Sequence, residues 1–409
     1  MVLYSLVRAD RTAELVPAVR CVSGTPATLV CMAIADIARK VERSINRVGT
    51  RKKAEDGWVP TITGFSGYGS QRRVHVVGRV LMQDPAHAEN DSHPDLPPTT
   101  HHIPRNPQTL REQAQKATEE AQRGWRQFFT IQVGDLPVTV RAGDKVVHSR
   151  TNNNGYIDVL VEDHGFEPGW HEVTIEAEGA EPVQTRVLIV SPGAKVGLIS
   201  DIDDTVMVTW LPRALLAAWN SWVRHTNTRQ PVDGMAEFYQ DILDEHPDAP
   251  VFYLSTGAWN TYETLESFLL KHRFPAGPML LTDWGPTPTG LFRSGQEHKK
   301  VQLRNLIIEY PDIQWILVGD DGQHDPLIYG EAVFEHPDRI AGVAIRQLTP
   351  GEHVLSHGTA VPFDEAAEAD QGGSVPTIYG ADGHELLTEY RKAPFPAVEE
   401  TADHVSPTV

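Results

Sequence analysis

The chain has 409 residues, more than one ordinary domain holds, so two or three domains are expected. Its formal net charge of −19 argues against a general nucleic-acid-binding protein, and no apolar run reaches the roughly 20 residues of a membrane-spanning helix. Only two cysteines occur, Cys21 and Cys31, without the spacing of a metal or redox pair, which favours a reduced, cytoplasmic setting.

The first segment, residues 1–57, is expected to be a lead-in followed by an amphipathic helix. Apolar residues recur every three or four positions between Ala27 and Val48, which is typical of one helical face. The opposite face is basic, and it contains Arg39, Lys40, Arg43, Arg47, Arg51, Lys52 and Lys53. A solvated helix face is the favoured interpretation, and a peripheral contact with anionic lipid is the alternative. The apolar stretch that ends before Asp36 has no convincing cleavage site, so a signal peptide is not expected.

Residues 58–192 are predicted to form a small, β-rich, sandwich-like domain. Strands are expected between Trp58 and Met82, around a turn at the sequence GFSGYGS, residues 64–70. Further alternating runs occur at Phe129–Val133, Val138–Val140, Ile157–Val161 and Val173–Ala177. Turn signals such as Asn154-Gly155 separate them, and this spacing is typical of an antiparallel sandwich. The Pro/His-rich stretch 84–107 lacks tight metal-ligand spacing and is expected to be a flexible loop, followed by a helix over 108–127.

Residues 193–393 are predicted to form an α/β domain, in which short apolar strands alternate with helices. Strands are expected at Val196–Ser200, Val251–Leu254, Met279–Leu281, Trp315–Val318 and Ile340–Ile345, and helices at Gly234–Glu245, Thr261–Lys271 and Lys299–Tyr310. This alternation indicates a parallel, doubly wound, Rossmann-like sheet. The small insert 206–232 is rich in tryptophan and leucine, and it is interpreted either as a flap that guides acyl chains or as a helix packed on the domain. Residues 394–409 are expected to be a disordered tail.

Carboxylates directly follow two of the predicted strands. The run DIDDT, residues 201–205, follows the strand that starts at Val196, and GDDGQHD, residues 319–325, follows the strand that starts at Trp315. Because the carboxyl ends of parallel strands meet at one edge of a sheet, we expect one shared site. A divalent cation would compensate the clustered acids, and Mg²⁺ fits donors that are all oxygens. The candidate metal ligands are Asp201, Asp203, Asp320, Asp321 and Asp325.

A hydroxyl and a lysine complete this set of groups. Ser255 and Thr256 end a third strand, and Ser255 is preferred as the hydroxyl donor because of its position at the strand end. Lys299 is preferred over Lys300 because Leu303 then marks the buried side of the same helix. Acids, a hydroxyl and a lysine supply a nucleophile, a metal site, a hydrogen-bond donor and a charge clamp, which are the groups that phosphoryl transfer uses.

The four segments occur in the order of the four motifs of the haloacid dehalogenase-like phosphatase superfamily. DIDDT has the form of its DxDxT signature, and FYLST (residues 252–256), Lys299 and GDDGQHD match its second, third and fourth motifs. The GFSGYGS run, the sandwich-like segment, FYLSTGAWN (252–260) and LVGDDGQHDPLIY (317–329) together resemble the actin-patch-protein type of phosphatidate phosphatase, in its bacterial branch. The resemblance runs from about Ala27 to Leu348. The chain departs from the fungal pattern at Thr256-Gly257-Ala258, where an Asn-Ser-Pro-like sequence would be expected, and this departure concerns the substrate more than the chemistry.

The resemblance implies a Mg²⁺-dependent phosphatase that forms an aspartyl phosphate. Asp201 would attack phosphorus, and Asp203 would protonate the leaving oxygen and then activate the hydrolytic water. Ser255 and Lys299 would neutralise the phosphate oxygens.

The resemblance also implies how the metal is held. The ligands would be the Asp201 carboxylate, the backbone carbonyl of Asp203 and Asp320, while Asp321 or Asp325 would hold those ligands in place. Asp204 is expected to be a loop cap or a solvent-facing residue. Polar residues that could reach the substrate from the rim of the site are Arg293, His298 and His324.

The implied substrate is phosphatidate or a related lipid phosphate, reached by a cytoplasmic protein that contacts the membrane peripherally. Two alternatives stay open at this point. One is a phosphatase for a soluble phosphomonoester, because the motifs report the phosphate and not the group that carries it. The other is a scaffold or membrane-associated binding protein with a vestigial phosphatase site.

Overall fold

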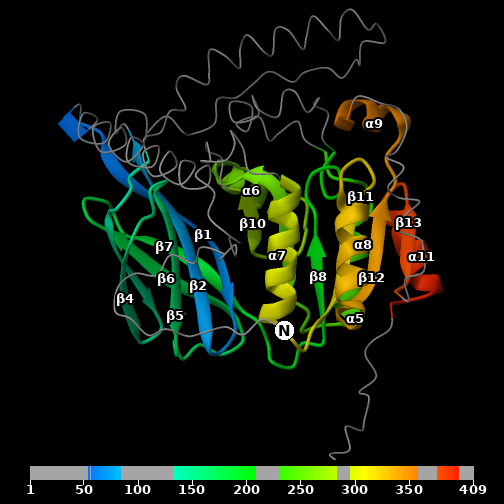
Figure 1. Cartoon of the computed structure of the whole chain (residues 1–409), viewed down its shortest axis with the longest axis horizontal. Coiled ribbons are helices and arrows are strands. Elements are labelled where there is room, and N and C mark those ends of the chain that lie inside the picture. Colours follow the sequence, from blue (N-terminus) through cyan, green and yellow to red (C-terminus); the bar gives the residue numbers. More distant parts are fainter. Residues whose placement is uncertain are drawn as a thin grey trace, which may run out of the picture.

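The computed structural model describes residues 54–55, 57–83, 132–208, 230–282, 295–357 and 375–395, and these form two sheets that lie next to each other (Figure 1). The predicted N-terminal helix, the Pro/His-rich loop, the helix over 108–127, most of the insert 206–232 and nearly all of the tail lie outside these residues. No helix within the described ranges is long and apolar enough to cross a membrane. All strands of the first sheet precede those of the second in the chain, and the predicted domain boundaries themselves stay predictions.

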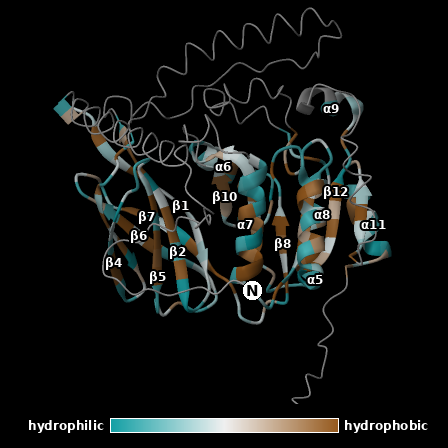
Figure 2. Ribbon diagram, in the orientation of Figure 1, coloured by the Kyte–Doolittle hydropathy of each residue, from teal (hydrophilic) through white to brown (hydrophobic). Residues whose placement is uncertain are grey.

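The first sheet has seven strands in the order β4-β3-β6-β7-β1-β2-β5. The strands are β1 (Val59–Gly69), β2 (Arg73–Gln83), β3 (Pro137–Ala142), β4 (Lys145–Arg150), β5 (Tyr156–Glu162), β6 (Gly169–Ala177) and β7 (Val183–Ile189). Neighbouring strands are antiparallel except β1 and β7. Apolar and polar residues alternate along these strands (Figure 2), and β3 and β5 contribute to one shared core, so the sheet curls over it. The predicted sandwich is therefore wrong in one respect, because a single curled sheet takes the place of two facing sheets.

The sequence GFSGYGS does not form the predicted turn, because residues 64–69 belong to β1 and the chain reverses only after them. A Cβ atom added at Gly64 would lie 2.6 Å from the Cβ of Thr185, and one at Gly67 would lie 2.1 Å from the carbonyl oxygen of His75. The glycines at these positions thus allow neighbouring strands to approach closely, so glycine here reflects close strand packing and not a turn. The pairing of β1 with β2 is also irregular between Phe65 and Tyr68.

The second sheet is parallel throughout and has the order β10-β9-β8-β11-β12-β13. Its strands are β8 (Val196–Ser200), β9 (Val251–Ala258), β10 (Met279–Thr282), β11 (Gln314–Asp320), β12 (Ile340–Arg346) and β13 (Thr377–Gly380). Every residue of β8 is buried, as expected for a central parallel strand covered on both faces. From β8 the chain first builds outward through β9 to β10 and then returns to the other side at β11. Ligands of open α/β sheets bind at such a reversal, beyond the carboxyl ends of the strands.

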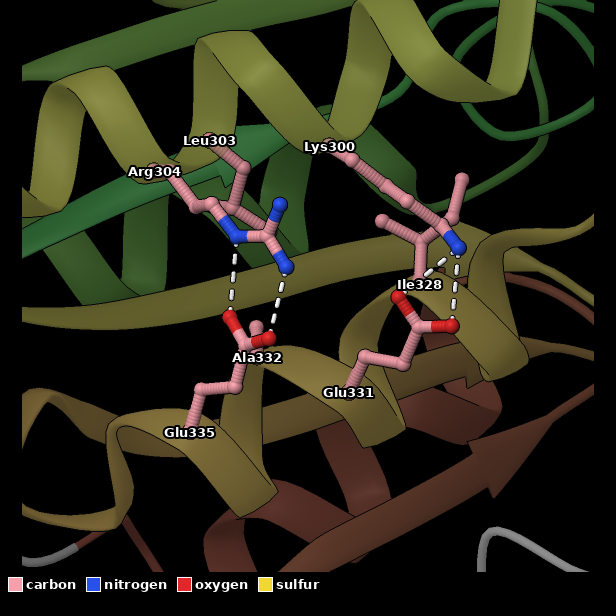
Figure 3. A pocket seen from close by; sticks show the side chains of 7 residues that line it. All are labelled: Lys300, Leu303, Arg304, Ile328, Glu331, Ala332 and Glu335. Carbon is pink, nitrogen blue, oxygen red and sulfur yellow. Dashed lines mark hydrogen bonds and ion pairs between the residues drawn. The ribbon is translucent and has the colours of Figure 1, made fainter. Parts of the chain in front are cut away.

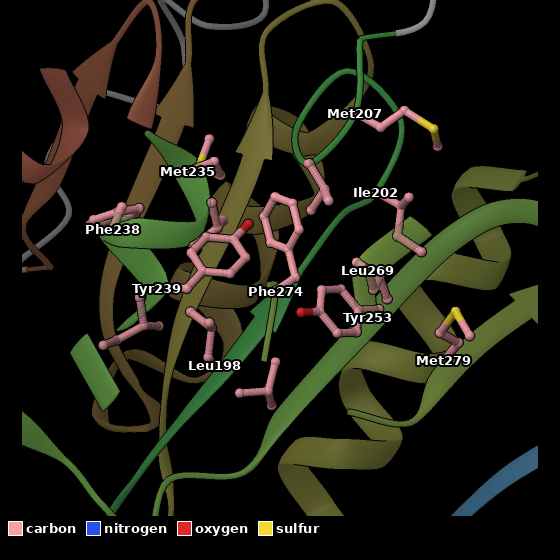
Figure 4. Packing of buried hydrophobic residues seen from close by; sticks show 14 of the residues in the cluster. Leu198, Ile202, Met207, Met235, Phe238, Tyr239, Tyr253, Leu269, Phe274 and Met279 are labelled. Atoms are coloured by element: carbon pink, nitrogen blue, oxygen red, sulfur yellow. The ribbon is translucent and has the colours of Figure 1, made fainter. Parts of the chain in front are cut away.

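Helices cover both faces of this parallel sheet. Within the described residues the helices are α5 (Met235–Glu245), α6 (Tyr262–Lys271), α7 (Gly295–Glu309), α8 (Asp325–Glu335), α9 (Pro350–His357) and α11 (Gly383–Lys392), and the short 3-10 helices are η4 (Trp259–Thr261) and η5 (Pro337–Arg339). Helices α5, α6 and α11 share a core with Leu198 of β8, where Tyr239 and Phe274 are packed (Figure 4). Helices α7 and α8 share the opposite core with Ile199. The predicted parallel, helix-covered sheet is confirmed, whereas β13, α8, α9 and α11 were not predicted.

The first sheet packs through β1 against η4 and α6, which follow strand β9 of the second sheet. The ring of Phe65 stacks on that of Trp259, with ring centroids 4.5 Å apart. Next to it, the Ser66 backbone N–H donates to the Tyr262 hydroxyl at 2.9 Å, and the Ser66 and Tyr262 hydroxyls lie 2.6 Å apart. Trp259 and Tyr262 follow β9 closely in the chain, so the first sheet contacts the segment that leads away from one of the strand ends at the candidate site.

Candidate active site

Three strand ends meet where the order of the parallel sheet reverses. Asp201 directly follows β8, Ser255 lies in the last half of β9, and Asp320 is the last residue of β11. Because β8 pairs with β9 on one side and with β11 on the other, the three side chains reach one edge of the sheet. The acidic segments that the sequence places on separate strands are thus brought together.

Three buried carboxylates form the centre of this site. Each of Asp201, Asp320 and Asp325 offers a carboxylate oxygen within 4.8 Å of the others. The Lys299 Nζ atom, on the first turns of α7, lies 2.6 Å from Asp201 Oδ1 and 2.6 Å from Asp325 Oδ1. The three carboxylates thus surround a single ammonium group, that of Lys299. The Asp201 Oδ2 atom has no hydrogen-bond partner among the described residues. An all-oxygen donor set with excess negative charge and a free carboxylate oxygen fits a divalent metal ion.

Burial and the charges of neighbouring groups shift the pKa values of Asp201, Asp320 and Lys299. Burial raises the pKa of Asp201 well above its usual value. The positive charge of Lys299 lowers this pKa, and the negative charge of Asp325 raises it further. Burial likewise raises the pKa of Asp320, and repulsion from Asp325 and Asp201 adds to it. Burial alone would lower the pKa of Lys299, but the surrounding carboxylates raise it above its usual value. A bound cation would relieve the repulsion among the carboxylates.

Asp203 stands beside this acidic triad, on the loop that follows β8. Its Oδ2 atom accepts a hydrogen bond from Ser255 Oγ at 3.1 Å, and its backbone carbonyl accepts one from Gln323 Nε2 at 3.1 Å. Ser255 is fully buried, and its Oγ also accepts from the Gly257 N–H at 2.9 Å. The structure thus places Ser255 at the site next to Asp203, while the Thr256 side chain lies against Gly295 at the start of α7.

Two other acidic residues of the motifs are Asp204, on the same loop, and Asp321, directly after β11. Asp204 is buried, with 5% of its surface exposed, so the expected solvent-facing position is wrong. Its φ of 61° lies in the left-handed region, which few residues other than glycine adopt. Asp321 is turned away from the triad, because its Oδ1 atom accepts from the Leu348 N–H at 2.8 Å and lies 3.4 Å from His353 Nε2. The metal-binding roles of Asp203 and Asp321 stay predictions.

Lys299 and Lys300 have different surroundings, although they are adjacent in the chain. Lys299 is almost completely buried between two carboxylates, whereas Lys300 forms an ion pair of 2.7 Å with Glu331. That pair lies in a shallow groove between α7 and α8, where Arg304 also pairs with Glu335 (Figure 3). The structure thus brings Lys299, and not Lys300, to the acidic triad.

Arg293, His298 and His324 were predicted to reach the substrate from the rim of the site. His298 Nε2 lies 3.3 Å from the carbonyl oxygen of Leu280, and Arg293 is among the residues that the structure does not describe. Sequence reasoning missed Gln323 and Arg346. The position of Arg346 directly after the predicted parallel strand Ile340–Ile345 could have indicated that it lies near the site.

Comparison with known proteins bears on the parallel-sheet domain. Residues 196–347 match the family described as the catalytic domain of the phosphatidate phosphatase APP1. The phosphatidate phosphatase APP1 of Saccharomyces cerevisiae is 28% identical over 152 residues, which are 37% of this chain and 26% of that protein. An uncharacterised protein of Schizosaccharomyces pombe is 25% identical over 154 residues, 37% of this chain and 25% of its own length. The chain therefore spans about a quarter of the length of these curated relatives.

The matched segment contains all four motifs and is similar to the phosphatidate phosphatase catalytic domain. It is shorter than the predicted resemblance, which extended from about Ala27 to Leu348. Among solved structures, a carbohydrate acetylesterase from Xanthomonas citri aligns with a TM-score of 0.24 and 10% identity, over 79% of this chain and 72% of that one. A likeness this weak carries no argument about fold or function.

Proposed function

We propose that this chain is a Mg²⁺-dependent phosphatase of the haloacid dehalogenase type that hydrolyses phosphatidate or a related lipid phosphate through an aspartyl phosphate. The observation that carries the proposal is the buried triad of Asp201, Asp320 and Asp325, with Lys299 inside it and one Asp201 oxygen free. The segment that contains it resembles a phosphatidate phosphatase catalytic domain.

Asp201 is the proposed nucleophile. The ion pair between its Oδ1 atom and Lys299 orients the carboxylate, which leaves Oδ2 to attack phosphorus in line with the leaving oxygen. As the bond from phosphorus to Oδ2 forms, the bond to the leaving oxygen breaks. Lys299 and the Ser255 hydroxyl then face the negative oxygens of the transferred phosphoryl group, where they stabilise the developing charge.

Asp203 is the proposed proton carrier. The hydrogen bond from Ser255 holds its carboxyl group beside the nucleophile, from where it gives its proton to the leaving alcohol. In the second step the same carboxylate takes a proton from water, and the resulting hydroxide attacks phosphorus. The bond between phosphorus and Asp201 then breaks, so inorganic phosphate is released and both carboxyl groups return to their starting state.

A magnesium ion would be held by oxygens of Asp201, Asp320 and Asp325, and by the Asp203 carbonyl in the arrangement that the superfamily resemblance implies. When bound, it would neutralise charge on the carboxylates and on the substrate phosphate. The lipid substrate is supported by the similarity to the yeast phosphatidate phosphatase. A lipid substrate implies a cytoplasmic protein that contacts the membrane peripherally.

The experiment that tests the proposal is phosphate release by the purified chain from phosphatidate in mixed micelles and from a panel of soluble phosphomonoesters. We expect release from phosphatidate that requires Mg²⁺ and falls on the order of a thousandfold or more in Asp201→Asn. Equal release by wild type and Asp201→Asn would refute the chemistry. Release from soluble esters alone would refute the lipid substrate, and liposome binding without any turnover would support the binding protein with a vestigial site.

A further inference from the structure

Arg346 joins three separate segments next to the active site. It is the last residue of β12, the ladder partner of Asp320, and only 5% of its surface is exposed. Its Nη1 atom donates to the Asp204 carbonyl at 2.7 Å, Nη2 to Glu352 Oε1 at 2.6 Å, and Nε to the Ala381 carbonyl at 3.1 Å. One guanidinium thus connects the loop after β8, helix α9 and the turn between β13 and α11.

The contact with Asp204 fixes an unfavourable backbone conformation. Asp204 has a positive φ, and its N–H donates to the Met207 carbonyl at 2.8 Å, which closes a tight loop over residues 203–207. A residue with a side chain adopts this region only when its surroundings hold it there. Arg346 helps to hold Asp204 in this conformation, because it donates a hydrogen bond to the carbonyl oxygen of the same residue.

The position of Asp203 depends on this conformation. Asp203 directly precedes Asp204, so a rotation of the backbone at 204 would turn the peptide between them. The Asp203 side chain is held by Ser255 and its carbonyl by Gln323, both from other strand ends. Arg346 is therefore a further anchor of the loop that carries the proposed acid and base, in addition to the Thr205 Oγ1 atom, which donates to Asp320 Oδ2 at 3.5 Å, and the Val206 carbonyl, which accepts from the Val232 N–H at 3.0 Å.

The other two partners of Arg346 are themselves anchored. Glu352 Oε2 accepts from the Thr349 N–H at 2.8 Å, which holds its carboxylate at the start of α9. The Gly383 N–H donates to the Asp233 carbonyl at 2.8 Å, so the turn that contains Ala381 is fixed to the segment before α5. Because residues 375–395 lie beyond the segment matched by the family, their contact with the site is a feature of this chain that the match does not cover.

We infer that Arg346 is a positioning residue that holds the backbone of the 203–207 loop, and with it Asp203, by connecting the loop to α9 and to the β13–α11 unit. The inference rests on the proposed function for its catalytic consequence. The loop geometry can be tested separately, because it does not depend on turnover. Lysine is the informative replacement, since it keeps the positive charge but cannot donate in the three directions of the guanidinium.

Arg339 offers a matched control at the opposite end of the same strand. It directly precedes β12, and its Nη2 atom donates to the carbonyl of Tyr310 at 2.6 Å. Arg339→Lys therefore also weakens an arginine–carbonyl contact, but at the end of the sheet far from the catalytic strand ends. Glu352→Gln is a milder variant that keeps Arg346 and weakens one of its anchors.

The experiment measures hydrogen exchange of the 201–208 amides together with kcat and KM for phosphate release. In Arg346→Lys we expect faster exchange in 201–208 with unchanged exchange in β8 and β11, and a kcat about ten- to a hundredfold lower at nearly constant KM. Glu352→Gln should show a smaller change of the same kind, and Arg339→Lys should show neither change.

Three results would overturn the inference. The first is a wild-type exchange rate of the 201–208 amides in both Arg346→Lys and Glu352→Gln. The second is an increase in exchange rate that is equal over all described residues in Arg346→Lys. The third is the same increase in the exchange of 201–208 in Arg339→Lys. If Arg346→Lys does not fold, the exchange of 201–208 in Glu352→Gln decides the question. If the wild type releases no phosphate, the proposed function fails, while the exchange data still decide whether Arg346 holds the loop.

Discussion

Replacement of Lys299 by methionine tests whether its ammonium balances the buried carboxylates. The lysine side chain is 3% exposed and contacts Asp201 and Asp325 at 2.6 Å each. Methionine keeps most of the aliphatic volume, so the packing around the lysine stem is retained while the charge is lost. Lys300→Met is the matched control, because Lys300 is the next residue and pairs with Glu331 at the partly exposed groove.

The two replacements should differ clearly in stability. Removal of one partner from a buried ion pair costs roughly 3–5 kcal/mol, because it leaves a buried charge without compensation. A surface pair such as Lys300 with Glu331 contributes about 0–1 kcal/mol. Since 1 kcal/mol corresponds to roughly 2–4 °C for a domain of this size, we expect Lys299→Met to lower the Tm by about 6–20 °C. Lys300→Met should lower it by no more than about 4 °C.

Thermal unfolding in the presence of EDTA measures this difference. The pKa of Lys299 is raised in the folded protein, so its contribution is present below the usual lysine pKa and is lost only as the pH rises through the folded value. Deprotonation of Lys299 itself should therefore not change the gap between wild type and Lys299→Met from pH 7 to pH 9. Added Mg²⁺ should stabilise Lys299→Met more than wild type, because no ammonium competes for the carboxylates. Equal losses in the two lysine variants would refute this account of the site.

Three further predictions concern the metal, the Arg346 contacts and the packing of the two sheets. Mg²⁺ added to the metal-free wild type should raise the Tm in a concentration-dependent way, and Asp320→Asn should abolish this response in the same thermal scan. Burial raises the pKa of Glu352, but hydrogen bonds from Arg346 and Thr349 outweigh this effect and lower the pKa below its usual value. The contribution of Glu352 to stability is therefore present above the usual glutamate pKa and is lost as the pH falls through the folded value. Glu352→Gln should accordingly be less stable than wild type at pH 7, with a gap that shrinks on acidification; a constant gap would contradict the assignment. Tyr262→Phe removes the hydroxyl that bonds Ser66 and should cost about 1 kcal/mol in urea unfolding, whereas no loss would show that ring packing alone joins the two sheets.

The sequence predicted those parts of the site that depend on local pattern. Asp201 and Asp320 were found because each ends an apolar run, and the carboxyl ends of parallel strands meet at one edge. Lys299 was preferred over Lys300 from helical periodicity, which assigns the two lysines to different faces of α7. Such signals lie within a few residues of the side chain concerned.

Other features depend on partners that are distant in the chain. The Asp204 carbonyl accepts a hydrogen bond from Arg346, and the Asp321 carboxylate accepts one from the Leu348 N–H, so the surroundings of neither residue follow from the acidic run itself. The GFSGYGS run was taken for a turn because glycines often mark turns, and its place in β1 depends on Thr185 and other groups of neighbouring strands. Strand β13 is short and half exposed, so it lacks the apolar run by which the other strands of the sheet were predicted.

The central position of β8 limits how the proposed nucleophile, Asp201, can move. Asp201 stands one residue beyond this strand, which is hydrogen-bonded to a neighbour along each edge. A fluctuation that displaces its backbone must open both ladders, so its free energy should approach that of global unfolding. Loops farther from β8 can then diversify during evolution while the Asp201 carboxylate keeps its position.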